Sequence, residues 1–295
     1  MTLRPQILVI RQLALGDVIL VTPIIRKIWE DYGGDCDIDV CTLKPDVFAN
    51  NPWVRDALLP QQYLEHQRYY DKSINLDRAY EKLPKIHITD AYSRYAFGLA
   101  DCSNPSPALF TTPEDKLFAQ NYIAEQIGGR KFGVIHMRRD TWPSRNLAPE
   151  FWEQLVTRVV NETQLDMIQI GSLHEIAFDG PKLTNALGKF TLHQLKEVIE
   201  SASFYIGIDS GTMHVAACTK TPIISMFTSA HHDYRKPRRP SSSPFFPITP
   251  DIDCYGCQAH IPPPITGVIC QRGDVECINR FSIDQIVNVA KGLTG

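Results

Sequence analysis

Short apolar runs alternate with helix-like repeats along most of this sequence, and that alternation constrains the fold more than any other feature. Residues 7–10 and 132–136 are apolar runs too short for helices, and the segments that follow them place apolar residues at helical spacing. Strands that alternate with helices form parallel sheets with helices on both faces. The sequence therefore predicts the α/β fold class.

The chain of 295 residues has room for two domains, each with its own core. A helix is predicted at residues 113–127, where it closes the first half of the chain. Gly128 and Gly129 follow as a hinge, and the strand-helix pattern restarts after them. We therefore predict two domains, residues 1–129 and residues 130–295.

The composition excludes some classes of protein. A formal net charge of −3 gives no global positive field for non-specific nucleic-acid binding, so we expect no nucleic-acid partner. Arg11 and Asp17 interrupt the first apolar run well before the roughly 18 residues that a membrane span needs, and no small-residue cleavage site follows. We predict a cytoplasmic protein and leave open a peripheral contact with the inner membrane. Its cysteines are then expected to be thiols or metal ligands.

Two turns that follow predicted strands each carry an acid and a glycine. In parallel sheets, ligands bind beyond the carboxyl ends of the strands. In the first turn, Gly16 allows a ligand to approach closely, and Asp17 is either a general base or a helix cap. The second turn opens a short helix whose amides and hydroxyls suit a pyrophosphate. Its residues are Asp209, Ser210, Gly211 and Thr212. His214 is either a further donor to that ligand or a packed helix residue.

Two strings of residues resemble one known family. RQLALGDVILVTPIIRKI near the start is similar to the G-D-V, T-P and R pattern of the lipopolysaccharide heptosyltransferases, glycosyltransferase family 9. DSGTMHVAACTKTPIISMF, from Asp209, is similar to the D-[ST]-G-x-x-H-[LV]-A-A pattern of the same family. Asn51 and Pro52 resemble a further family feature. The resemblance spans nearly the whole chain and implies the GT-B fold, in which two Rossmann-like domains face each other across a central cleft.

The resemblance also implies roles for the domains and residues. The N-terminal domain would bind the acceptor, and the C-terminal domain would bind the nucleotide-sugar. Asp17 matches the family's proposed catalytic base, and Glu175 matches the glutamate that contacts the nucleotide ribose. The donor-diphosphate loop is matched by Asp209, Ser210, Gly211, Thr212 and His214. After residues 132–136 the chain departs from the family pattern, and we choose Arg145, with Arg138 second, as the basic ligand of the donor phosphates.

The activity that the resemblance implies is the inverting transfer of a heptose or related sugar. The donor would be a nucleotide-sugar, with ADP-heptose implied, and the acceptor a hydroxyl of lipopolysaccharide, another glycan, a lipid-linked glycan or a protein. No cofactor is required for this reaction. Two other functions fit the same fold: a nucleotide-sugar epimerase, and a non-catalytic protein that binds a sugar-nucleotide or a metal. A nicotinamide dehydrogenase fits less well, because the spaced-glycine fingerprint is missing.

The last part of the chain carries a cysteine pattern that begins with C-x-x-C. Residues 228–266 lack periodicity and are predicted to be loop, and the pattern begins inside them. Four thiols at this spacing either form a tetrahedral structural site for zinc or iron, or remain four unligated cysteines. The residues are Cys254, Cys257, Cys270 and Cys277.

Overall fold

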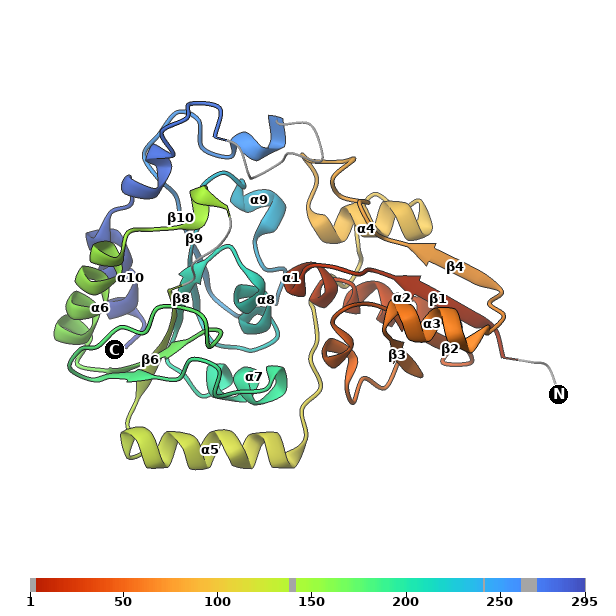
Figure 1. Cartoon of the computed structure of the whole chain (residues 1–295), viewed down its shortest axis with the longest axis horizontal. Helices are drawn as coiled ribbons and strands as arrows, with labels where there is room; N and C mark the ends of the chain where they lie inside the picture. Colours follow the sequence, from red (N-terminus) through yellow and green to blue (C-terminus); the bar gives the residue numbers. More distant parts are fainter. Residues whose placement is uncertain (1–3, 138–141, 241, 261–269, 295) are drawn as a thin grey trace. The chain divides into compact units, whose positions relative to one another are not determined.

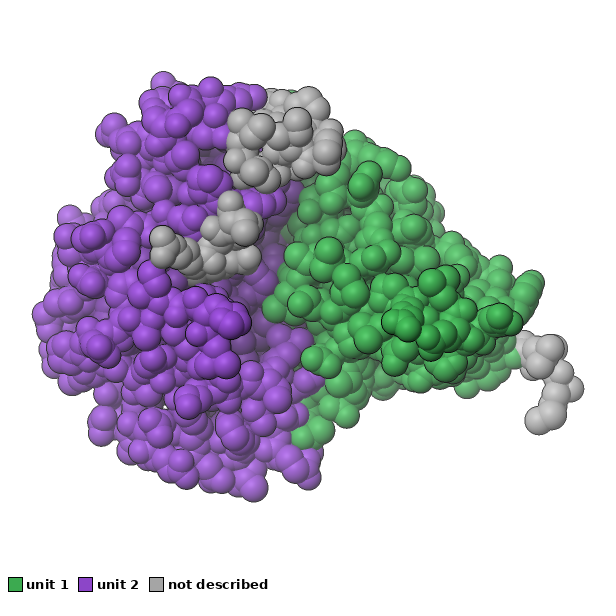
Figure 2. All heavy atoms as spheres, in the orientation of Figure 1, with its two compact units in different colours: residues 1–112 green, residues 113–295 purple. Residues whose placement is uncertain are grey.

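The computed structural model describes residues 4–137, 142–240, 242–260 and 270–294. The chain divides into two compact units, Met1–Thr112 and Pro113–Gly295, called the first and second units below (Figure 2). Each unit contains one parallel sheet with its helices, so the predicted α/β class is confirmed (Figure 1). Within the described ranges, no helix combines the length and the apolar character that crossing a bilayer requires.

The first unit is built on a four-stranded parallel sheet in the order β3-β2-β1-β4. Its strands are β1 (Gln6–Ile10), β2 (Asp37–Cys41), β3 (Asp56–Leu58) and β4 (Lys72–Asn75). Its helices are α1 (Leu15–Ile19), α2 (Thr22–Asp31), η1 (Pro45–Phe48), α3 (Pro60–His66) and α4 (Ile88–Phe97). The chain runs outward from β1 to β3 and returns to the other side of β1 for β4. The topological switch point, where open α/β sheets bind ligands, therefore lies between β1 and β4.

Pro23 divides the helical segment after β1 into two helices. The first helix, α1, ends at Ile19, and α2 begins at Thr22 with Pro23 in its first turn. Proline is tolerated there because the first N–H groups of a helix have no intrahelical partner. The short helix α1, which carries Gly16 and Asp17, is therefore a separate helix between β1 and α2.

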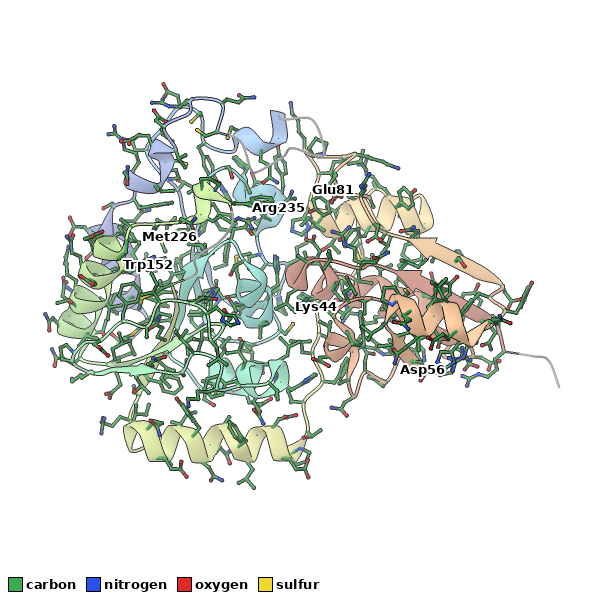
Figure 3. All side chains as sticks on the ribbon, in the orientation of Figure 1. Lys44, Asp56, Glu81, Trp152, Met226 and Arg235 are labelled. Atoms are coloured by element: carbon green, nitrogen blue, oxygen red, sulfur yellow. The ribbon has the colours of Figure 1, made fainter. Side chains whose placement is uncertain are left out.

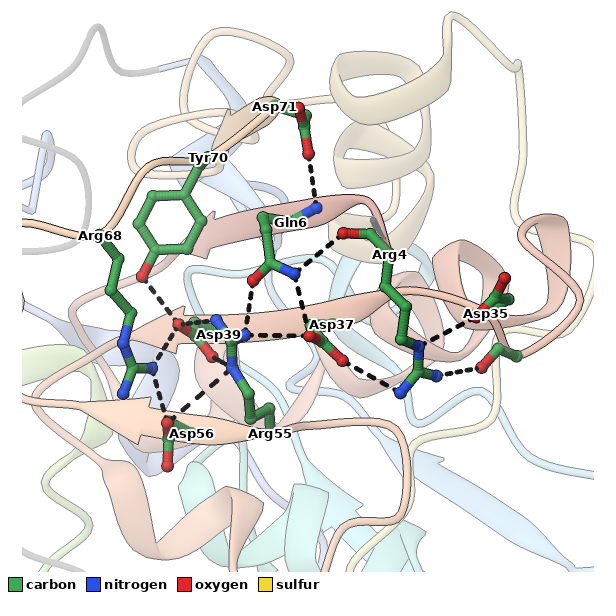
Figure 4. A network of polar contacts seen from close by, with 11 residues as sticks. Arg4, Gln6, Asp35, Asp37, Asp39, Arg55, Asp56, Arg68, Tyr70 and Asp71 are labelled. Atoms are coloured by element: carbon green, nitrogen blue, oxygen red, sulfur yellow. Dashed lines mark hydrogen bonds and ion pairs between the residues drawn. The ribbon is translucent and has the colours of Figure 1, made fainter. Parts of the chain in front are cut away.

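A buried carboxylate in β2 connects this strand to the segments that precede β3 and β4. Asp39, in the middle of β2, accepts hydrogen bonds from Arg55 at 2.7 Å, from Arg68 at 2.8 Å and from the Tyr70 hydroxyl at 2.8 Å (Figure 4). Burial alone would raise the pKa of Asp39, but these three donors together hold it below its ordinary value. Because Arg55 precedes β3 and Tyr70 precedes β4, the network fixes both strands relative to β2.

The second unit is built on a six-stranded parallel sheet in the order β10-β9-β8-β5-β6-β7. Its strands are β5 (Phe132–His136), β6 (Asp166–Ile170), β7 (Leu183–Asn185), β8 (Tyr205–Ile208), β9 (Ile223–Met226) and β10 (Phe245–Ile248). Its helices are α5 (Pro113–Ile127), η2 (Pro143–Arg145), α6 (Pro149–Thr163), α7 (Leu192–Glu200), α8 (Gly211–Ala217), α9 (His232–Arg235), η3 (Cys257–His260), η4 (Glu276–Asn279) and α10 (Ile283–Gly292). The strand order changes direction between β5 and β8, which places the switch point there.

The core of the second unit lies between the sheet and helices α6 and α10, which pack against each other (Figure 1). Trp152 of α6 and Met226 of β9 are both part of it and are almost completely buried (Figure 3). Burying a side chain of this size contributes about 1.5–3 kcal/mol. The packed core makes the strand ends of the second sheet a rigid support for the loops that follow them.

The boundary between the units differs from the predicted one. The glycine pair predicted a boundary near residue 129, whereas the compact units divide between Thr112 and Pro113. The rings of Phe118 and Tyr122 on α5 make edge contacts with Phe190, just before α7, at centroid distances of 6.3 and 4.8 Å. Helix α5 therefore packs within the second unit, a tertiary contact that a local glycine signal does not reveal.

The prediction that residues 228–266 are loop is wrong in part. Within the described residues of this range, α9 is a short helix and β10 extends the sheet beside β9. The four residues of β10 include Pro247, which occupies the edge of the sheet, where a missing donor is tolerated. So short a strand with an internal proline leaves no periodic signal.

Candidate functional site

Asp17 lies at the switch point of the first unit, where two residues hold its carboxylate. Arg11, the residue after β1, donates from Nη2 to Asp17 Oδ2 at 2.5 Å, and the Tyr80 hydroxyl donates to the same oxygen at 3.2 Å. The N-cap of α1 is Ala14, so Asp17 is in the first turn of the helix and does not cap it. One carboxylate oxygen is thus fixed, and Oδ1 has no hydrogen-bond partner among the described residues.

Arg11 is a buried cation shared by several acidic groups. Its residue is 4% exposed, and its guanidinium nitrogens lie 3.7 Å from Asp77 and 3.8 Å from Glu81. Burial alone would lower the pKa of Arg11, but the surrounding tyrosines and carboxylates raise it, so the guanidinium remains charged. Burial also raises the pKa of Glu81. The arrangement gives Asp17 a fixed orientation and a positive neighbour.

Arg145 and Asp209 form an ion pair at the switch point of the second unit. Arg145 Nη2 lies 2.8 Å from Asp209 Oδ2, and the side chains are 16% and 9% exposed. The guanidinium also lies over the ring of Trp142, 4.2 Å from its centroid, in a cation–π contact. The pair brings together two residues that the sequence assigned to the donor. Arg138, the second choice for the phosphate ligand, lies outside the described residues.

His136, the last residue of β5, connects the two loops beside it. Its Nδ1 lies 2.7 Å from Thr212 Oγ1 and 3.3 Å from Ser210 Oγ, both in the turn after β8. Its Nε2 lies 3.3 Å from Oε2 of Glu175, in the loop after β6. The imidazole is 4% exposed. His136 therefore links the predicted diphosphate loop to the predicted ribose ligand.

Glu175 is an ionised carboxylate held by two neighbours. Its Oε1 accepts a hydrogen bond from the Ser172 N–H at 3.1 Å, while the buried Oε2 lies 3.3 Å from His136 Nε2. Burial alone would raise the pKa of Glu175, but His136 and Ser172 lower it. A Cβ on Gly171 would stand 2.5 Å from Oε2, so only glycine lets the strand end this close to Glu175. An ionised carboxylate just beyond a strand end suits ribose hydroxyls.

The other residues predicted in the second turn lie at the start of α8. Ser210 is the N-cap, but its hydroxyl makes no capping bond and lies 2.9 Å from the hydroxyl of Thr212. Gly211 begins the helix, and His214 is a buried helix residue, 4% exposed. The turn thus brings together the acid, the hydroxyls and the histidine that the motif predicted.

The four tail cysteines line one small cavity. They are free thiols, and the cavity has a volume of about 20 Å³, room for one water-sized or ion-sized occupant. Burial and the neighbouring thiols raise the pKa of Cys277 to about 12. Across the ranges that the structure describes, no group of three or more His, Cys, Asp or Glu side chains is arranged to hold a metal ion. The cysteines are therefore gathered but not disposed as a ligand set.

One family model and a curated protein are similar to part of this chain. The model of glycosyltransferase family 9 (heptosyltransferase) matches residues 171–254, which include Glu175 and Asp209. An Escherichia coli protein named lipopolysaccharide heptosyltransferase 3 is 35% identical over 74 residues, 24% of this chain and 22% of that protein. The chain thus spans 22%, about a fifth, of the length of this curated relative.

Three solved structures are similar over nearly the whole chain. The glycosyl transferase family 9 structure from Veillonella parvula has a TM-score of 0.79 at 16% identity, covering 99% of this chain and 97% of that one. E. coli ADP-heptose lipopolysaccharide heptosyltransferase II has a TM-score of 0.72 at 15% identity, covering 98% of each chain. TibC, an iron-containing dodecameric glycosyltransferase from enterotoxigenic E. coli, has a TM-score of 0.72 at 15% identity, covering 98% of this chain and 76% of that one.

The fold, with a parallel sheet in each unit, is the GT-B fold that the sequence predicted. The predicted resemblance to glycosyltransferase family 9 is supported over residues 171–254 by the family model, and the similarity of fold extends over nearly the whole chain.

Sequence reasoning missed three residues of these sites. Arg11, Tyr80 and His136 contact predicted site residues, yet none was assigned a role. Arg11 and His136 stand at the carboxyl ends of β1 and β5, so a polar side chain at the end of a buried run was a usable signal. Tyr80 had no such signal, because only the return of the chain to pair β4 with β1 brings it near Asp17.

Proposed function

We propose that this protein is an inverting glycosyltransferase that moves a heptose from ADP-heptose to a hydroxyl of lipopolysaccharide or a related glycan. The observation that carries the proposal is that one chain holds an oriented carboxylate, Asp17, at one switch point, and groups suited to a diphosphate and a ribose at the other. The donor and acceptor are taken from the names of the E. coli relatives.

The second unit supplies the groups for the donor. Arg145 presents a planar guanidinium whose geometry matches phosphate oxygens, and Trp142 stacks on it and limits its motion. The turn from Asp209 to His214 adds backbone amides to which a diphosphate can bind. Glu175 is ionised, and its carboxylate accepts hydrogen bonds from the ribose hydroxyls in the complex. No metal ion is needed in this scheme, because Arg145 and the amides offset the charge of the leaving diphosphate.

The first unit supplies the base. Asp17 removes the proton from the acceptor hydroxyl as that oxygen forms a bond to the anomeric carbon, and the bond from that carbon to the diphosphate oxygen breaks on the opposite side. The anomeric configuration is inverted as a result. Arg11 and Tyr80 hold Oδ2, so that Oδ1 faces the incoming hydroxyl. The acceptor binds on the first unit, and we place the reaction in the cytoplasm, with peripheral contact at the inner membrane where the acceptor is lipid-linked.

Product analysis tests the proposal. The purified chain is incubated with ADP-heptose, with and without a deacylated lipopolysaccharide core acceptor, and both ADP and the sugar product are measured. Transfer predicts ADP release that depends on the acceptor and a product of inverted configuration. Epimerised nucleotide-sugar without transfer would establish an epimerase instead, and no turnover despite donor binding would establish a non-catalytic binding protein.

We also propose that the four tail cysteines hold one structural iron or zinc ion. Four thiolates are a suitable donor set for either metal, and the cavity that they line has room for one ion. The raised pKa of Cys257 and of Cys277 belongs to a cluster without a cation, and the thiols would have to lose their protons and close around the ion. Bound there, the metal would tie the loop around Cys254 to η4, in a cavity that Pro143 and Ser144 of η2 also line.

Metal analysis separates this proposal from four unligated thiols. Protein purified without added metal should contain about one equivalent of iron or zinc, and Cys257→Ser should lose it. Cys218→Ser, which changes a buried cysteine on another helix, should keep the metal. A metal-free wild-type chain that gains no thermal stability when iron or zinc is added would contradict the proposal.

A further inference from the structure

The hydroxyl of Thr212 already has as many partners as a hydroxyl can have. Its Oγ1 lies 2.7 Å from His136 Nδ1, 2.8 Å from the Tyr205 hydroxyl and 2.9 Å from Ser210 Oγ. A hydroxyl donates one hydrogen bond and accepts two. Thr212 therefore cannot donate to a diphosphate without losing one of these partners, although the motif marks its hydroxyl as a diphosphate ligand.

Glu175 sets the direction of the hydrogen bonds around His136. Because Glu175 is ionised and lies 3.3 Å from Nε2, the neutral imidazole carries its single proton on Nε2 and leaves Nδ1 as an acceptor. Thr212 then donates to Nδ1 and accepts from Tyr205 and Ser210. In this state each of the three hydroxyl hydrogens is used inside the protein, and none is directed to a ligand.

Adding one proton to His136 changes how many of these hydroxyl hydrogens are used inside the protein. When Nδ1 of His136 is protonated, it donates to Thr212, whose own hydrogen must then point elsewhere. Thr212 can donate to Ser210 while it still accepts from Tyr205, and in the 3.3 Å contact between Ser210 Oγ and Nδ1 the hydroxyl oxygen then becomes the acceptor. The hydrogen of Ser210 is released by this reversal. Ser210 stands at the start of α8, next in sequence to Asp209 of the Arg145 ion pair, where the proposed diphosphate binds.

We infer that binding of the nucleotide-sugar diphosphate is coupled to the uptake of one proton by His136, which turns the Ser210 hydroxyl into a donor to the diphosphate. The inference rests on the proposed donor site. The imidazolium also adds a full positive charge at the end of β5 without a metal ion. His136 is thus a positioning residue that acts on the ligand through Thr212 and Ser210.

Charged and titratable groups from several elements face His136 or the cluster that it joins. From the loop after β6, the carboxylate of Glu175 faces Nε2. From β8, Tyr205 reaches the cluster through Thr212. Asp209 after β8 is paired with Arg145 of η2, so that pair is neutral as a whole. His214 of α8 is the other imidazole of the same turn. A dianionic diphosphate would add two negative charges to these described groups, and a proton on His136 would offset one of them.

Calorimetry counts the proton directly. ADP-heptose is titrated into the protein near pH 7.5 in buffers of different ionisation enthalpy; its diphosphate diester does not itself titrate there. About one proton should be taken up per donor bound, and the affinity should fall by about tenfold per pH unit at higher pH. His136→Gln should bind the donor more weakly, without proton uptake and with little pH dependence. His66→Gln, an exposed histidine of α3, should retain the wild-type proton count.

The outcomes separate this inference from the proposed function. Donor binding by the wild type with no proton uptake, or uptake that persists in His136→Gln, would overturn the inference and leave the transferase proposal intact. Absence of donor binding would overturn both. If His136→Gln does not fold or bind, the imidazole nitrogen resonances of the labelled wild type decide the matter. Both nitrogens of His136 should be protonated in the complex, and a bare Nδ1 would refute the inference.

Discussion

Removing the guanidinium of Arg145 should damage both donor binding and the stability of the second unit. Charges 2.8 Å apart attract each other by about 6 kcal/mol at an effective dielectric constant of about 20. Desolvation offsets part of this, and breaking one side of a buried pair costs about 3 kcal/mol. Arg145→Ala should therefore lower the melting temperature of the second unit by roughly 6–12 °C. The unpaired Asp209 would also repel the diphosphate.

The effect on the donor is calculated separately. A hydrogen bond to a charged group contributes about 1.5–3 kcal/mol, so Arg145→Ala should weaken donor binding by about 10- to 150-fold. Arg145→Lys keeps the charge but loses the planar fork and the stacking on Trp142, and should lose about tenfold. Calorimetric titration with ADP-heptose measures both.

A double-mutant cycle with Asp209→Asn tests the reasoning. Because Asn is neutral, the double variant should regain about 2 kcal/mol of the stability that Arg145→Ala loses. Asp209→Asn alone removes the charged partner but keeps the Arg145 guanidinium, so it should keep donor affinity. Wild-type affinity in Arg145→Ala, or an equal loss in Asp209→Asn, would refute the assignment of Arg145 as the phosphate ligand.

Two further predictions concern the loops and the sheet. Gly171→Ala should displace Glu175 by steric contact and weaken donor binding about tenfold in a titration. Gly180→Ala should not weaken it, because the added Cβ meets only Leu183, at 3.8 Å. Equal donor affinities of the two variants would contradict the ribose role of Glu175. Asp39→Asn should lower the free energy of unfolding by about 2 kcal/mol at pH 7 in urea titrations. The folded pKa of Asp39 is below its ordinary value, so this stability difference should persist above about pH 4 and shrink as the pH falls through the folded pKa. A stability difference that does not depend on pH would contradict the network around Asp39.

The regular elements of the fold could be predicted where the sequence carries a strong local signal. The strand Phe132–His136 and the helix Pro113–Ile127 have the predicted bounds, because an uninterrupted apolar run and an N-terminal proline with helical spacing mark them. The edge strands Asp56–Leu58 and Leu183–Asn185 were not predicted. Three residues are too few for a period-2 signal, and pairing with the neighbouring strand is what orders them.

The candidate site could be predicted in its motifs but not in its contacts. The turns at Asp17 and Asp209 were found because a glycine and an acid follow a buried run. That Asp209 pairs with Arg145, and that His136 joins Thr212 to Glu175, depends on β5 lying between β8 and β6 in the sheet. Strand order is a non-local property, so spacing along the chain does not contain it.

The Asp17→Asn variant tests the central claim most directly, since it removes the base while its oxygen can still accept from Arg11 and Tyr80. A general base contributes about 10²- to 10⁴-fold to the rate. The account predicts that kcat for heptose transfer falls by that factor, while affinity for ADP-heptose, measured by calorimetry, stays close to that of the wild type; thermal stability should fall, because buried Arg11 loses a charged partner. Undiminished transfer by folded Asp17→Asn protein would contradict it.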